Sequence, residues 1–106
     1  MIRFHCSLPI ERTEVRVLGK QLLRSGTSVA ANYREASRAR SDAEFIPKIQ
    51  QYAQEAFETT LWVELLRDDC GIRSSAAERL LKESGELIAI CVTMSKNVKR
   101  RLNNEP

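Results

Sequence analysis

The feature that most constrains the fold is the spacing of apolar and small side chains between residues 15 and 36. They recur in steps of three and four, which places them on one face of a helix. The members of this stripe are Val15, Leu18, Leu22, Ser25, Val29, Asn32 and Ala36. Small residues interrupt the stripe at its middle, where a glycine costs a helix roughly 1 kcal/mol. Because small side chains let another element approach closely, we expect Gly26 and Ser28 to lie at a tight helix–helix contact, with a helix break at Gly26 as the alternative.

A second helix is predicted after Ser41, which forms the pattern of a capping box with Glu44. Its apolar side chains again follow steps of four and three: Phe45, Ile49, Tyr52, Ala56, Thr59, Val63 and Leu66. Pro47 lies beyond the first turn, so its ring should distort the helix there. Gly71 is the expected left-handed residue that ends this helix.

The third predicted helix begins at a second capping box, formed by Ser75 and Glu78. Residues 1–9 are interpreted as an N-terminal stub, since a short alternation ends at Pro9. The chain has only four glycines and three prolines and no useful strand alternation. The sequence therefore predicts one all-α domain, an antiparallel up-and-down bundle of the four-helix type whose first helix is short or missing. The long helices are expected at about residues 10–39, 42–70 and 76–102.

Composition limits the compartment and the chemistry. The longest apolar run, residues 87–92, is too short to span a bilayer, and the first residues lack an apolar signal core. We therefore expect a cytoplasmic protein without a membrane partner. Cys6, Cys70 and Cys91 form no CxxC pair and are expected to be reduced thiols, with Cys91 in the core.

No catalytic constellation is evident. The single histidine, His5, lies in the stub, so neither a metal site nor a nucleophile–base pair is expected. Glu55 and Glu58 lie three residues apart and could share a face, but a solvated or inter-subunit acidic face is the simpler interpretation. The sequence therefore predicts no catalytic residues, no metal, no cofactor and no enzymatic activity.

Charge changes sign along the chain, although the net charge is only +3. Residues 1–40 carry eight basic and three acidic side chains, residues 41–71 two and seven, and residues 72–106 seven and four. Such a pattern suits attracting antiparallel neighbours, or an acidic and a basic face. The basic clusters could follow phosphates, or could be ordinary solvated faces. The candidate nucleic-acid contacts are Arg16, Lys20, Arg24, Lys96, Lys99, Arg100 and Arg101. Tyr33 and Trp62 could stack on bases, but packing is expected of them.

Three stretches carry a family resemblance: residues 20–36 (KQLLRSGTSVAANYREA), 40–45 (RSDAEF) and 55–66 (EAFETTLWVELL). With a weaker match in the last helix, the chain resembles the four helix bundle protein family, also called the 23S rRNA intervening sequence protein family, over about residues 8–100. The resemblance implies an antiparallel four-helix bundle and a homo-oligomer, namely a ring of five. The family is also similar to the accessory protein of diversity-generating retroelements, which binds nucleic acid and a reverse transcriptase through a basic surface.

The sequence departs from this family in two places. The family's first helix is almost absent, so three long helices should leave an open apolar groove unless another chain, or residues from an earlier start codon, fill it. Pro47 also stands where the family has a small or polar residue. Glu35 belongs to the motif and is expected to pair with a nearby arginine. The residues assigned to the structural motif are Gly26, Ser28, Asn32, Glu35, Ser41 and Glu44.

Two functions remain open at this point. The first is a non-enzymatic oligomeric bundle that binds RNA, DNA or a nucleic-acid enzyme such as a reverse transcriptase through its basic surface. The second is a structural or protein-interaction module that does not bind nucleic acid.

Overall fold

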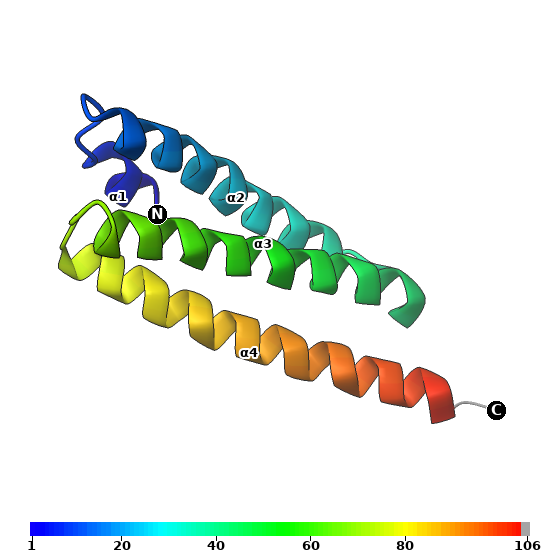
Figure 1. The fold of residues 1–106 in the computed structure, drawn as a ribbon. Coiled ribbons are helices and arrows are strands. Elements are labelled where there is room, and N and C mark those ends of the chain that lie inside the picture. Colours follow the sequence, from blue (N-terminus) through cyan, green and yellow to red (C-terminus); the bar gives the residue numbers. More distant parts are fainter. Residues whose placement is uncertain (105–106) are drawn as a thin grey trace.

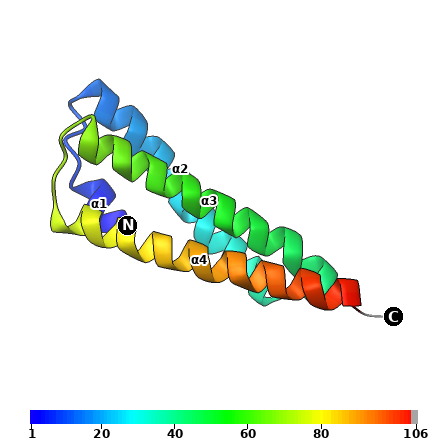
Figure 2. The same ribbon diagram turned by 60° about the horizontal axis from the view of Figure 1, so that its bottom comes forward.

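The computed structural model describes residues 1–104 and folds them into four helices (Figure 1). These are α1 (Ile2–Cys6), α2 (Thr13–Ser37), α3 (Asp42–Asp68) and α4 (Ser75–Asn104). The three long helices run antiparallel with short links, and α3 packs against both α2 and α4 (Figures 1 and 2). The molecule is elongated, 58 × 19 × 17 Å. The prediction of an all-α up-and-down bundle with a short first helix is confirmed.

The helix ends follow local capping chemistry. Ser41 Oγ accepts a hydrogen bond from the Glu44 N–H at 3.2 Å, as predicted, but the Glu44 carboxylate accepts from the Arg40 N–H at 2.7 Å instead of returning to Ser41. At the start of α4 the cap is Ser74, whose Oγ accepts from the Ala77 N–H at 3.1 Å, so the box predicted at Ser75 lies one residue too late.

Of the three residues expected to end, break or distort a helix, only Gly71 lies at a helix end. Gly71 has φ +73°, so the left-handed residue after α3 is confirmed. The helix α2 runs unbroken through Gly26, which excludes the predicted alternative of a break. The helix α3 also continues through Pro47, although the proline has no N–H to donate to the carbonyl of Ala43.

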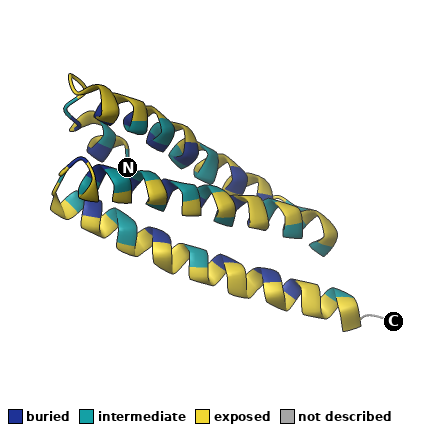
Figure 3. Cartoon of the chain, in the orientation of Figure 1, coloured by how far each residue is buried: buried dark blue, intermediate teal, exposed yellow. Residues whose placement is uncertain are grey.

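The core lies between α3 and its two neighbours (Figure 3). Near α1 it includes the fully buried Val15, Leu22, Val63 and Leu66, and Phe4 and Leu8 pack against them from the N-terminal segment. A second cluster lies toward the other end and contains Ala36, Ile49, Tyr52 and Cys91. The short α1 therefore closes only one end of the bundle, where a full-length fourth helix would cover its whole length.

The small residues of α2 have neighbours other than those predicted. A Cβ placed on Gly26 would lie 2.5 Å from Met1 Cε, so the residue beside Gly26 is a flexible side chain at the start of α1 and not the backbone of a long helix. Ser28 is half-buried. The close polar contact between α2 and α3 is made by the fully buried Ser25, whose Oγ accepts a hydrogen bond from Thr59 Oγ1 at 2.9 Å.

Candidate nucleic-acid interface

The antiparallel topology brings the basic last turns of α4 to the same end of the molecule as the α2–α3 link (Figure 1). That link and its flanks carry four more cations, which sequence reasoning did not select. We call this set the basic end: Arg34, Arg38, Arg40, Lys48, Lys96, Lys99, Arg100 and Arg101. The position of the link could have identified the first four. In an up-and-down bundle the first and third long helices run in the same direction, so their C-terminal ends lie at the same end of the molecule.

Two of these cations are neutralised by neighbouring carboxylates. Lys48 Nζ lies 2.6 Å from Glu35 Oε2. The Arg101 guanidinium donates to both carboxylate oxygens of Asp42, each at 3.0 Å. Glu35 is therefore ion-paired, with a lysine of α3 instead of the predicted arginine.

The other six cations of the basic end are exposed and form no ion pair within the part of the chain that the structure describes: Arg34, Arg38, Arg40, Lys96, Lys99 and Arg100. Three acidic side chains accompany the set, namely Glu35, Asp42 and Glu44. Positive charge therefore predominates at this end, and most of it is available to an external anion.

The three other cations predicted to contact nucleic acid do not lie at the basic end. Arg16, Lys20 and Arg24 occupy the first half of α2, and Arg16 is separated from Arg38 by about 33 Å of helix. Arg24 is also engaged, because it lies 2.9 Å from Glu58 and 3.6 Å from Glu55. The structure therefore brings together the four predicted cations of α4 but separates them from the three of α2.

The paired glutamates of α3 and the aromatic side chains singled out in the sequence take up packing positions. The Arg24 guanidinium lies against both Glu55 and Glu58, which accounts for that pair as an inter-helix contact. Asn32 is buried in the α2 face. Trp62 is half-buried and packs against the core near α1, whereas Tyr33 is 57% exposed with its ring 5.7 Å from that of Tyr52.

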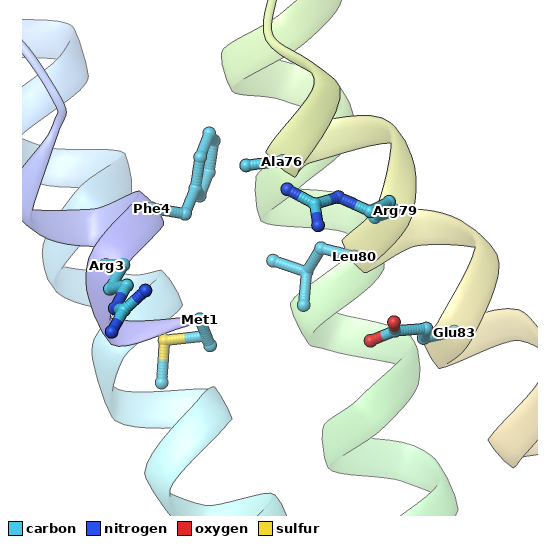
Figure 4. Close-up of a pocket in the computed structure, with 7 residues that line it drawn as sticks. All are labelled: Met1, Arg3, Phe4, Ala76, Arg79, Leu80 and Glu83. Carbon is cyan, nitrogen blue, oxygen red and sulfur yellow. The ribbon is translucent and has the colours of Figure 1, made fainter.

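A cleft of about 250 Å³ lies between α1 and α4 (Figure 4). It is bordered by the Arg3, Arg79 and Glu83 side chains and by apolar groups of Met1 and Leu80. Across residues 1–104, no three His, Cys, Asp or Glu side chains gather where they could hold a metal ion. The thiol most enclosed in the bundle, Cys91, has its pKa raised by burial, so it is protonated at neutral pH and is a poor nucleophile.

An apolar groove runs between α2 and α4, with α3 as its floor. Its part near α1 is a cavity of about 150 Å³ bordered by Met1, Gly26 and Leu87. The next part, about 300 Å³, is also bordered by Leu87 and includes Ile90 and Met94. The groove predicted from the missing first helix is confirmed.

Three long antiparallel helices, one basic end and a groove in place of a full-length fourth helix define a helical-bundle protein. A family model described as 23S rRNA-intervening sequence protein matches residues 3–93, so the chain belongs to that family. A crystal structure of a protein of unknown function from the S23 ribosomal protein family of Bacteroides thetaiotaomicron is 41% identical, with a TM-score of 0.69 over 76% of this chain and 74% of that one. No curated protein matches the chain. Over the described residues, no helix has both the length and the apolar composition needed to cross a membrane.

Proposed function

We propose that this protein is a non-enzymatic helical bundle that binds nucleic acid through its basic end. The supporting observation is the group of six exposed Lys and Arg side chains without an ion pair, which two helix ends contribute to one end of the bundle. Cations that replace the counterions condensed on phosphates supply most of the affinity in sequence-independent binding. The proposed ligand is therefore the phosphate backbone of RNA or DNA.

The chemistry of the basic end favours phosphate contacts over base recognition. Its members are lysines and arginines, and contacts of these side chains with phosphates position a protein without identifying a sequence. The exposed Tyr33 lies in the groove beside Tyr52 and not among these cations. Binding is therefore expected to be sequence-independent and strongly salt-dependent.

Self-association forms part of the proposal. The groove exposes large apolar side chains, including Ile90, which is 54% exposed. Contiguous exposed apolar surface is typical of an interaction site. A homo-oligomer, for which the family resemblance implies a ring of five, would repeat the basic end and add avidity. The same surfaces support the second candidate, a structural or protein-interaction module whose basic face meets an acidic protein.

The test is a fluorescence-anisotropy titration of labelled single-stranded RNA and duplex DNA at about 50 and 200 mM salt, the range over which six to ten phosphate contacts lose about 10³–10⁵ in affinity. The variant Arg38→Ala/Arg40→Ala/Lys99→Ala/Arg100→Ala should bind much more weakly and with a smaller salt slope. The matched control is Arg16→Ala/Lys20→Ala, which should bind as the wild type does. Loss of binding in the control alone would move the site to α2, and no binding at low salt would eliminate nucleic acid and leave the interaction module.

A further inference from the structure

A second hollow lies between α3 and α4, on the other side of their contact from the groove (Figures 1 and 2). We call it the α3–α4 cleft, and its volume is about 240 Å³. Cys91 is buried and borders both hollows, Ile90 before it borders the groove, and Val92 after it borders the cleft. Successive residues of a helix are rotated by about 100°, so the two hollows lie on opposite sides of Cys91. The cleft therefore does not depend on what covers the groove.

Lysines border the α3–α4 cleft, and carboxylates are absent from the segments that form it. Lys96 and Lys99, both members of the basic end, line the cleft. Neither forms an ion pair within residues 1–104. Residues 45–54 of α3 and 87–104 of α4 include no aspartate or glutamate. The cleft is therefore an extension of the basic end that attracts anions.

The exposed ring of Phe57 continues the α3 wall of the cleft. Gln50 and Ala53 line that wall, and Phe57 follows them by seven and four residues, which places the three on one face of α3. The ring is 67% exposed. The glutamates on either side of it in sequence, Glu55 and Glu58, lie against an arginine of α2. An exposed aromatic ring therefore extends the surface on which the two lysines lie.

We propose that single-stranded nucleic acid runs from the basic end along this face, an inference that rests on the proposed function. Its phosphates contact Lys96 and Lys99, one unpaired base enters the α3–α4 cleft and another stacks on Phe57. Aromatic rings stack on any base, so this contact keeps binding sequence-independent. An apolar cavity of about 150 Å³ holds benzene, so the cleft of about 240 Å³ has room for the ring of a base. The Gln50 amide both donates and accepts hydrogen bonds, which suits more than one base edge.

The spacing of these groups fits several nucleotides. Arg101 pairs with Asp42 across the two helices, which fixes their alignment. Phe57 lies about 23 Å from Asp42 along α3. Lys96 lies about 8 Å from Arg101 along α4, so about 15 Å of the bundle separates the lysine from the ring. About four nucleotides cover this distance at the duplex rise of about 3.4 Å, and fewer do so when extended.

The bases of a duplex are already paired and stacked, so a duplex cannot fill either position without being opened. Lysines contact the phosphates of a duplex and of a single strand alike. Phe57 and the cleft should therefore contribute to the affinity for single strands alone, whereas the cations contribute to the affinity for both.

The test is fluorescence anisotropy at low salt with single-stranded RNA, single-stranded DNA and a duplex, each of about ten nucleotides, within the usual range of single-strand site sizes. Phe57→Leu should weaken single-strand binding at least about five-fold, the lower bound for loss of one stacked base, and leave duplex binding unchanged. Phe57→Trp should bind single strands as the wild type does. A loss confined to RNA or to DNA would support the stacking and identify the strand.

The cleft is tested separately by Ala53→Leu, which narrows it without changing charge. This variant should also lose affinity for single strands alone. The matched control is Ala31→Leu, an exposed position on α2 that borders neither the cleft nor the groove, and it should bind as the wild type does. Far-UV circular dichroism should show the same helical content in all the variants.

Fluorescence separates stacking from a structural role of Phe57. Phe57→Trp adds an exposed indole to the half-buried Trp62, and its emission should be quenched by a single strand and not by the duplex. Unchanged single-strand binding by Phe57→Leu would overturn the inference and leave the basic end as the nucleic-acid site. Equal losses for single strand and duplex, with a smaller sedimentation coefficient, would also overturn it and assign Phe57 to a contact between copies. A wild type that binds neither ligand would overturn this inference and the proposed function together.

Discussion

Replacement of Gly85 by alanine should stabilise the protein. Gly85 lies in the interior of α4, and a Cβ placed there would have no neighbouring atom within 4 Å. The substitution therefore adds no clash and removes the conformational penalty of glycine, which is about 0.8–1.0 kcal/mol relative to alanine in a helix interior. For a domain of this size, that gain corresponds to a rise in the melting midpoint of about 4–8 °C.

The assay is urea unfolding of the wild type and Gly85→Ala, followed by far-UV circular dichroism at one fixed protein concentration. The matched control is Gly71→Ala, since the φ of +73° at Gly71 disfavours any side chain and the change should cost about 1–2 kcal/mol. Opposite shifts of the two variants are expected. A loss of stability in Gly85→Ala would refute the reasoning, because it would mean that another surface packs closely on this face of α4.

Three further outcomes follow from the core. Phe4→Ala should lower the free energy of unfolding by about 3–5 kcal/mol, because its ring is 4% exposed against the first core cluster, and an unchanged urea midpoint would show that α1 does not dock. Thr59→Val should cost about 1 kcal/mol through loss of its hydrogen bond to Ser25, and an equally stable variant would show that this bond contributes nothing net. Burial raises the pKa of both Tyr52 and Cys91, so the unfolded state releases their protons first and stability should fall as pH rises through the ordinary pKa of each group. Tyr52→Phe should make this fall in unfolding free energy smaller above about pH 10, the ordinary pKa of tyrosine, and an unchanged pH profile would contradict the assignment.

The sequence by itself determined the helices. Apolar spacing of three and four residues and the side-chain caps act within a few residues, so the three long helices, the cap at Ser41 and the left-handed Gly71 were all predictable. The groove that residues 1–104 leave open was predictable as well, because residues 1–9 are too few to run the length of three long helices. The exact capping residue of α4 was not predictable, because the adjacent serines are chemically equivalent candidates. The sequence predicted Ser75, whereas Ser74 accepts the capping hydrogen bond.

Only the tertiary structure decided which charged side chains meet. Glu35 pairs with Lys48 and not with an arginine, because the rotation of α3 about its own axis places the lysine opposite it. The cations of the α2–α3 link join those at the end of α4, about sixty residues later in the chain, whereas Arg16 is left at the other end. Periodicity fixes which face of each helix is apolar, but the direction, rotation and alignment of neighbouring helices depend on packing along the whole bundle, and these three variables assemble the candidate site.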